Sequence, residues 1–294
     1  MNLLKKKDVM YFFLPAAIFM FLFLLYPLLM LVVDSFFQTN NSNAKSFVGL
    51  DNYFQAFTSK TFIKVSVNTL IYVVVAVSLE LFFGLVLAIV FSHQFKGANI
   101  LRTLCLSPLM IAPLVAGLIW KFMLSDQFGI VNVLLDKSGL ISSTNSILWL
   151  ADERFALIST IIADVWLTTP FMMLMLFAGI QGIPNSLYEA ASIEGASRMQ
   201  IIFKIIIPSI KPVIISALVI RVIDAARSFD IIWAMTQGGP NFSSELLSVH
   251  IYKMLQRYGD VGYASSVAVL FIIVLITITL ISMKKIWIFD EKSN

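Results

Sequence analysis

Long apolar runs alternate with polar segments along the whole chain. Six runs contain about 20 or more mostly apolar residues, the length that crosses the hydrocarbon core of a bilayer as a helix. They are residues 10–33, 65–91, 103–124, 155–180, 213–235 and 262–283. Backbone groups in lipid must be satisfied internally, so only helices and closed barrels can span it. Because these runs are too long and too uniformly apolar for barrel strands, the pattern predicts an all-α, polytopic transmembrane bundle with six spans.

The composition supports a membrane protein. Of the 294 residues, 59% are hydrophobic and 13% are charged, and the mean hydropathy is +0.89. A soluble domain carries about twice that share of charge. The net charge of +4 therefore indicates membrane topology rather than a nucleic-acid partner. One cysteine and two histidines leave little material for a metal site, and we expect none.

Basic residues are distributed unevenly between the polar segments. When the N-terminus, residues 92–102, residues 181–212 and the C-terminal tail are placed on one side, that side holds eleven Lys and Arg residues. The other side holds seven. Short loops rich in Lys and Arg remain in the cytoplasm. The distribution therefore predicts a single membrane domain over residues 1–294, with both termini and the loop 181–212 in the cytoplasm.

One cytoplasmic segment is more structured than a linker needs to be: YEAASIEGASRMQIIFKIIIPSIKP, residues 188–212. Ser186 is placed to cap a first helix, with Glu189 at its third position. Gly195 interrupts the helical pattern, and a second helix over 199–207 runs to Pro208. IIFKIII is more apolar than a solvated loop. The segment is either a docking element for another protein or an interfacial helix that packs on its own protein.

This segment resembles the EAA loop of permease subunits in binding-protein-dependent ABC transporters. In that family an EAA triplet is followed by a glycine and then by a proline thirteen residues further on. The chain departs from the pattern mildly, because the acidic residue before the glycine is usually aspartate and is glutamate here. The matching positions are Glu189, Ala190, Ala191, Glu194, Gly195 and Pro208.

The resemblance implies a coupling helix that inserts into a cleft on a cytoplasmic ATPase subunit. Glu189 would pair with a basic residue of the ATPase, Ala190 and Ala191 would allow close packing, and Gly195 would form the turn. The chain has no G-x-x-x-x-G-K-[ST] phosphate loop, so ATP and magnesium would be bound by the partner subunits. The chain would then be a transport subunit without enzymatic activity.

The same resemblance implies the remaining partners and the location. These are two ATPase subunits, a second and homologous permease, and an extracytoplasmic solute-binding protein, in a bacterial or archaeal cell membrane. Residues 235–271 and the stretch VGLDNYFQAF at 48–57 resemble sugar permeases of the maltose and glycerol-phosphate type. We therefore expect the solute to be a sugar or a related polyol, carried by alternating access. The apolar spacing of 48–57 predicts a short helix on the outer surface.

Charged and aromatic residues inside the apolar runs mark a candidate solute pathway, because ionisable groups in a membrane usually face a cavity or the bundle interior. In the fifth run, the family resemblance favours Arg227, Ser228, Asp230 and Trp233. In the fourth run, the candidates are Asp164, Trp166, Thr168 and Thr169. Weaker candidates are Glu80, Trp120 and Lys121.

A structural role competes with a solute role for each of these charges, since ion pairs can hold helices together. Arg221, Asp224, Arg227 and Asp230 alternate in sign at steps of three residues, and neighbours at that spacing can pair. Arg221 is the one that we expect to be structural or to act in gating.

Other functions remain open at this point. An ABC permease for a non-sugar solute would carry the same EAA loop. A transporter driven by an ion gradient could use Glu80, Asp164, Asp224 and Asp230 as proton relays, but it would leave that loop unexplained. A membrane enzyme is disfavoured, because the sequence has no His box, no H-E-x-x-H motif and no convincing nucleophile–base pair.

Overall fold

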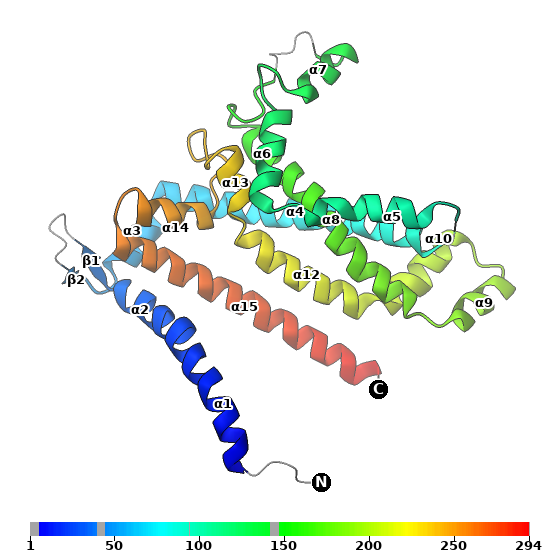
Figure 1. Ribbon diagram of the computed structural model, residues 1–294, viewed down its shortest axis with the longest axis horizontal. Helices are drawn as coiled ribbons and strands as arrows, with labels where there is room; N and C mark the ends of the chain where they lie inside the picture. The colour runs from blue at the N-terminus through cyan, green and yellow to red at the C-terminus, as the bar shows by residue number, and fades with distance from the viewer. Residues whose placement is uncertain (1–5, 40–44, 94, 142–146, 294) are drawn as a thin grey trace. The chain divides into compact units, whose positions relative to one another are not determined.

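The computed structural model describes residues 6–39, 45–93, 95–141 and 147–293, and these residues are mostly helical (Figure 1). The expected cytoplasmic position of the two chain ends concerns residues 1–5 and 294, which lie outside the described residues. The contacts divide the chain into two units, which are described separately. One contains residues 1–62 and 251–274, and the other contains residues 63–250 and 275–294.

Four helical runs of the described chain are long and apolar enough to cross a membrane by themselves. They coincide with the first, second, fourth and sixth runs of the sequence. The first is continuous through α1 (Lys6–Met20), the π-helical η1 (Phe21–Leu25) and α2 (Tyr26–Asp34). The other three are α4 (Lys60–Ser92), α8 (Ala156–Gln181) and α15 (Val261–Ser293).

The other two apolar runs are bent. The third consists of α5 (Ala98–Leu106) with η2 (Ser107–Met110), followed at an angle of 100° by α6 (Pro113–Met123). Proline explains this bend, because Pro113 disfavours a helical conformation for the preceding Ala112, whose ψ is 137°. The structure thus contains up to six spans if each bent pair counts as one.

The fifth apolar run is interrupted twice. The segment Arg198–Ser209 meets Lys211–Met235 at an angle of 67°, with Pro212 close to the junction. A second break separates α12 (Lys211–Ala226) from α13 (Asp230–Met235), so residues 227–229 leave the helix. The fifth run is therefore not one straight helix, although its apolar pattern is continuous.

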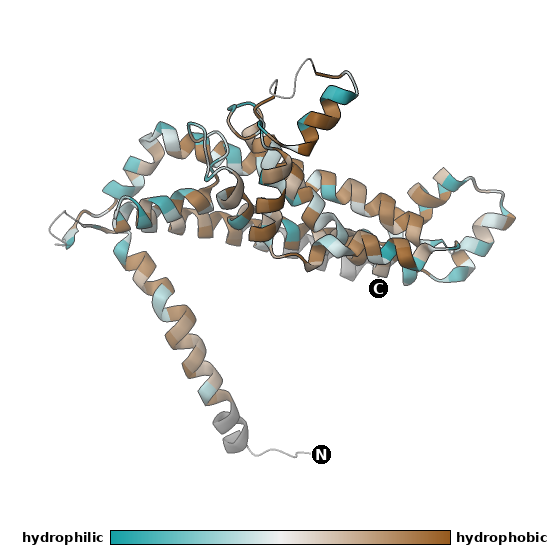
Figure 2. Ribbon diagram, turned by 45° about the horizontal axis from the view of Figure 1, so that its top comes forward, coloured by the Kyte–Doolittle hydropathy of each residue, from teal (hydrophilic) through white to brown (hydrophobic). Residues whose placement is uncertain are grey.

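Exposed apolar side chains cover the long helices. Phe23 is 69% exposed and Leu70 is 64% exposed. Figure 2 shows hydrophobic residues along the lengths of these helices and hydrophilic residues in the segments that join them. A water-soluble monomer rarely exposes apolar surface on this scale, so these faces are suited to lipid or to neighbouring subunits.

The first unit contains a small hairpin and a short helix. Strand β1 (Phe37–Thr39) pairs antiparallel with β2 (Lys45–Phe47), and α3 (Asp51–Thr58) follows. The Asn52 amide is buried and donates to the carbonyls of Ser35 and Phe37, at 2.9 and 3.0 Å. The helix predicted over residues 48–57 is confirmed, and a buried asparagine ties it to the end of α2.

The second unit has its core between α4, α8, α12 and α13, with α6 packed closely on α13. Glycine permits that close approach. A methyl group at Gly117 of α6 would lie 2.8 Å from Cβ of Ala234 and 3.2 Å from the Ile231 backbone. Neither neighbour has a flexible side-chain end that could move aside.

We predict that Gly117→Ala destabilises the protein by about 1–3 kcal/mol, the usual effect of overpacking a dense contact. The measurement is thermal unfolding of the purified protein in detergent. Gly182→Ala is the matched control, because its added methyl would meet nothing closer than 3.4 Å. Equal unfolding midpoints for the two variants would contradict the tight α6–α13 contact.

Candidate functional site

The segment that resembles the EAA loop forms a helix, a turn and a second helical stretch. Helix α9 (Asn185–Ile193) is followed by Gly195, which has a φ of +72°. Glycine adopts this left-handed conformation without the cost that other residues incur. The chain then continues through α10 (Arg198–Ile201), η3 (Ile202–Ile206) and α11 (Ile207–Ser209), where Pro208 is exposed. The predicted helix–turn–helix is thus present.

The predicted cap of the first helix is wrong. Pro184 has an extended ψ of 135° and precedes the helix directly, so α9 begins at Asn185. Ser186 is the second residue of this helix and Glu189 is the fifth. The capping box lies instead at the start of α10, where the Gln200 side chain accepts from the Ser197 amide at 2.7 Å. The sequence SRMQ carried that signal, because serine and glutamine three residues apart form such a box.

The two alanines of the EAA triplet point in different directions. Ala191 is buried against its own protein, whereas Glu189 and Ala190 are exposed. Beyond them Ile193 is 88% exposed, which is unusual for a large apolar side chain. The outer face of α9 therefore presents a carboxylate, a small residue and an uncovered isoleucine.

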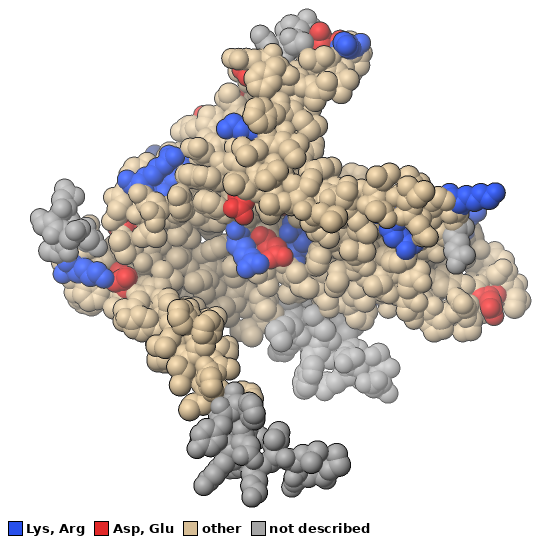
Figure 3. All heavy atoms as spheres, in the orientation of Figure 1, with Lys and Arg blue, Asp and Glu red and all other residues tan. Residues whose placement is uncertain are grey.

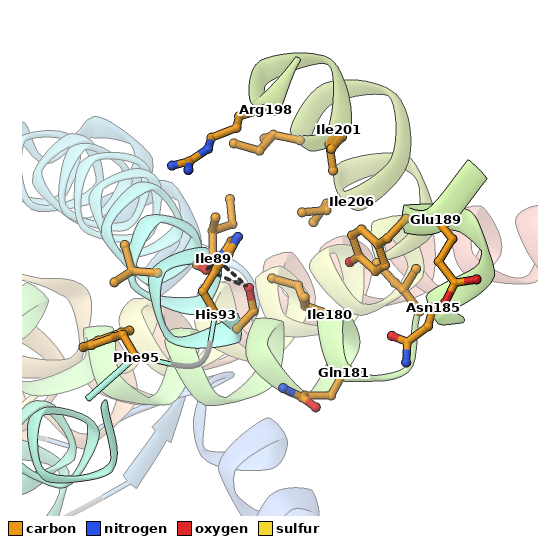
Figure 4. Close-up of a pocket in the computed structure, with 15 residues that line it drawn as sticks. Ile89, His93, Phe95, Ile180, Gln181, Asn185, Glu189, Arg198, Ile201 and Ile206 are labelled. Carbon is orange, nitrogen blue, oxygen red and sulfur yellow. Dashed lines mark hydrogen bonds between the residues drawn. The ribbon is translucent and has the colours of Figure 1, made fainter. Parts of the chain in front are cut away.

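A cavity of about 760 Å³ lies behind α9, between α10–η3 and the adjoining ends of α4 and α8. Figure 4 shows Ile89 and His93 from α4 on one side, and Asn185 and Glu189 from α9 on the other. Tyr188 also lines the cavity. Partial burial raises the pKa of Tyr188 above its ordinary value.

A buried ionic cluster joins three helices of the second unit. Arg221 from α12 donates through Nε to Oε2 of Glu80 at 2.6 Å and through Nη2 to Oε1 at 2.7 Å. The same Nη2 lies 3.1 Å from Oδ2 of Asp164 on α8. Thr168 donates its hydroxyl to Glu80 at 2.8 Å. The three charged side chains are at most 6% exposed.

This cluster bears directly on two predicted pathway residues. The Asp164 carboxylate is paired with Arg221, and the Thr169 hydroxyl is buried and donates to the Val165 carbonyl at 2.6 Å. Both polar groups are thus already satisfied within the chain. The structural role considered from the sequence, in which ion pairs hold helices together, therefore fits Glu80, Asp164 and Arg221. A solute role for Asp164 and Thr169 stays a prediction.

The pathway residues predicted in the fifth run gather around the break at 227–229. Arg227 and Asp224 form an ion pair of 2.6 Å, and the Arg227 side chain is 67% exposed. Asp230 is exposed at the start of α13. Figure 3 shows a small group of acidic and basic atoms in the middle of a largely uncharged face.

Aromatic rings lie beside these polar groups. Phe229 and Trp233 stack with centroids 5.4 Å apart and an interplanar angle of 14°. Trp166 forms an edge contact of 6.0 Å with Trp120 of α6. Ser228 lies 3.4 Å from the Tyr72 hydroxyl, oxygen to oxygen. The structure therefore brings Arg227, Ser228, Asp230 and Trp233 to one helix break, whereas Asp164 belongs to the buried ionic cluster.

The glycine-rich turn after α13 is tightly packed. Gly238 has a φ of +85°, and a methyl group there would lie 2.9 Å from the buried Glu245 side chain. The Ser244 hydroxyl lies 2.6 Å from the Gly239 carbonyl. Helix α13 ends at Met235, as the run Gly238-Gly239-Pro240 predicts. Sequence reasoning did not identify Glu245 as part of this turn, although the sequence places this acidic residue directly after small residues.

Among the residues that the structure describes, no group of three or more histidine, cysteine or carboxylate side chains is placed to hold a metal ion. The comparisons with known proteins agree with transport. Residues 80–286 match the family described as the binding-protein-dependent transport system inner membrane component. The chain belongs to this family. It is thus a multi-pass membrane component of a transport system and not an enzyme.

Two relatives are similar over most of their length. The chain is 38% identical to the trehalose/maltose transport system permease protein MalF of Thermococcus litoralis, over 82% of this chain and 80% of the relative. It is 34% identical to the sulfoquinovosyl glycerol transport system permease protein SmoG of Agrobacterium fabrum, over 92% and 87%. The two alternatives considered from the sequence, a transporter driven by an ion gradient and a membrane enzyme, do not predict membership in a binding-protein-dependent transport family.

Solved structures show the same fold. A subunit of a bacterial ABC transporter involved in the import of the acidic polysaccharide alginate matches with a TM-score of 0.82 and 23% identity. The match covers 95% of this chain and 94% of that chain. A second crystal structure shows the alginate transporter with an alginate pentasaccharide-bound periplasmic protein, and it matches with a TM-score of 0.79. The fold of this chain is therefore that of an ABC transporter permease.

We predict that Arg221→Met destabilises this permease by about 3–5 kcal/mol, because two buried carboxylates lose their shared cation. Thermal unfolding of the purified transporter measures the loss. Arg227→Met removes an exposed ion pair and should cost about 1 kcal/mol or less. The triple variant Glu80→Gln, Asp164→Asn and Arg221→Met should recover much of the stability. Equal effects of the two single substitutions would argue against the buried cluster as a structural clamp.

Proposed function

We propose that this chain is the permease subunit through which an ATP-driven ABC importer carries a sugar or a related polyol. The main support is the similarity to permeases named for trehalose/maltose and for sulfoquinovosyl glycerol, which extends over at least four fifths of each relative. Both names describe sugars or sugar derivatives. A permease for a non-sugar solute would keep the fold and the EAA loop, so direct transport assays decide between the two.

The complete importer in this proposal contains a second, homologous permease, two cytoplasmic ATPase subunits and an extracytoplasmic sugar-binding protein. The whole chain acts as one membrane domain with six spans and cytoplasmic ends, in the cell membrane of a bacterium or archaeon. ATP and magnesium are bound by the ATPase subunits. The uncovered apolar faces of the long helices are suited to the second permease as well as to lipid.

The loop 181–212 couples this permease to an ATPase. Three features of the outer face of α9 support such a role: the exposed Glu189 carboxylate, the small Ala190, and the uncovered Ile193. A carboxylate suits a basic residue of the ATPase, and the small residue permits close approach. Gly195 turns the chain so that the second helical stretch leads directly into α12. In this proposal ATP-driven movement of the loop rocks α12 and opens the pathway outward.

The solute contacts the break at 227–229. Asp230 and Trp233 are one helical turn apart on α13 and therefore share a face. Carboxylate and guanidinium groups bind sugar hydroxyls, and an indole ring covers the apolar face of a sugar ring. Arg227, Ser228, Asp230 and Trp233 supply these groups, and Trp166 adds a further exposed ring. Asp164 and Thr169 of α8 complete the pathway in this proposal, although Asp164 also pairs with Arg221 and the Thr169 hydroxyl also donates to the Val165 carbonyl.

We predict that Glu189→Lys abolishes coupling. In proteoliposomes with the full set of subunits, the sugar-loaded binding protein should no longer stimulate ATP hydrolysis, and uptake should fall by at least about tenfold, the effect of a loss near 1.4 kcal/mol. Asp126→Lys is the control, since it makes the same charge change at an exposed residue outside loop 181–212. Restored uptake with an acidic substitution in the ATPase would identify the partner. Normal uptake by Glu189→Lys would refute the docking role.

We predict that Asp230→Asn lowers ATP-dependent sugar uptake about tenfold or more, because a hydrogen bond to a charged group contributes about 1.5–3 kcal/mol. Uptake of labelled disaccharide into proteoliposomes measures it, with Asp126→Asn as the control. Stimulation of the ATPase by the loaded binding protein should persist. If the reconstituted wild type instead moves only non-sugar solutes, the sugar assignment fails while the coupling role stands.

A further inference from the structure

The cavity behind α9 is larger than the coupling role requires. Its volume of about 760 Å³ falls in the range of sites that hold a drug-sized molecule. It is lined by residues from four elements: the ends of α4 and α8, helix α9, and the stretch α10–η3. One side chain inserted by a partner protein would fill only part of it. The occupant should therefore be a molecule with a long apolar part.

Five isoleucines form the apolar part of the cavity lining, which we call its floor: Ile89 from α4, Ile180 from α8, and Ile201, Ile202 and Ile206 from α10–η3. Polar residues such as Gln181 and Asn185 line other parts of the cavity. Removing apolar surface from water gives about 25 cal/mol per Å², so an apolar chain is favoured here. A small soluble anion would leave this floor uncovered.

One end of the cavity is basic. Arg198 is exposed, and it forms no ion pair with any residue that the structure describes. Figure 4 shows its side chain extending from α10 toward the end of α4 that carries His93. His93 lies with Nδ1 2.9 Å from the Ile89 carbonyl, so this nitrogen donates and the ring orientation is held.

The acidic group of the cavity lies apart from this basic end. Figure 4 shows the Glu189 carboxylate beside Asn185, on the opposite side from Arg198 and His93. An anionic group at Arg198 therefore does not have to approach Glu189. The separation also leaves Glu189 available for the ATPase.

The cavity also lies at the ends of two helices that are long and apolar enough to cross a bilayer. Helices α4 and α8 are both apolar enough to span a bilayer, and their last turns, through Ser92 and Gln181, line the cavity. We propose that an anionic phospholipid of the bilayer occupies it, with the phosphate at Arg198 and an acyl chain over the isoleucine floor. The lipid would brace α9 against the ends of α4 and α8.

The test uses the complete transporter, purified and then incubated with vesicles of phosphatidylcholine that contain a minor share of phosphatidylglycerol. Native mass spectrometry counts the phosphatidylglycerol retained. Arg198→Glu should weaken retention at least about fivefold, the effect of one basic group near an anionic surface. Lys204→Glu is the matched control, because this exposed lysine is six residues further on and is not among the residues that line the cavity. Equal retention in these two variants would overturn the proposal.

A second variant separates the lipid from other occupants. Ile202→Trp keeps Arg198 but fills part of the floor, and it should also reduce retention of phosphatidylglycerol. If Ile202→Trp retains the lipid fully, or if excess inorganic phosphate displaces it, the site binds a soluble anion and the proposal is wrong. If the lipid is retained only when the ATPase subunits are removed, the ATPase fills the cavity and the proposal is likewise wrong. Sugar uptake is not measured, so these outcomes do not depend on the solute.

Discussion

The arrangement of α4, α8 and α12 depends on one buried cation. Arg221 carries a charge that a low-dielectric interior does not tolerate unless it is paired, and it is satisfied by carboxylates from two other helices at 2.6 to 3.1 Å. Apolar contacts between helices in a membrane have little hydrophobic driving force, because lipid tails are equally apolar. Hydrogen-bonded charges are directional and define how the helices meet. Helix α12 is thus held at Arg221, between the end that follows loop 181–212 and the end at the break 227–229.

The segment from α9 to α11 has three different structural features along a short stretch. Ala191 packs α9 on its own protein, Glu189 and Ile193 are exposed, and Gly195 redirects the chain toward α12. The stretch α10–η3 is apolar because it closes a cavity, which explains the oily sequence better than a free loop does. Of the two interpretations considered from the sequence, packing on the same protein is confirmed for α10–η3, and docking on a partner stays a prediction for the exposed face of α9.

Much of the fold could be predicted from the sequence, because apolar length and the EAA pattern are local signals. The bends could not be predicted in this way. The 100° angle at Pro113 lies inside a run that is uniformly apolar, and hydropathy carries no information about the direction of a helix. Serine is a good cap, so the sequence predicts Ser186 as the residue before the first helix, but the structure has Pro184 in that position and α9 begins at Asn185. The pairing of Arg221 with Glu80 and Asp164 joins residues up to 141 positions apart. Each charge was visible alone, but only the packing of three helices makes them partners.

The position of Arg221 along α12 has a mechanical consequence. The helix runs from Lys211 at the coupling end to Ala226 at the break. With a rise of 1.5 Å per residue, Arg221 stands about 15 Å from the first residue and about 8 Å from the last. If α12 tilts about this fixed point it acts as a lever with unequal arms, and a displacement at the coupling end reaches the break reversed in direction and reduced to about half. Small, accurately scaled movements of the solute-facing residues would then follow from large movements of the loop.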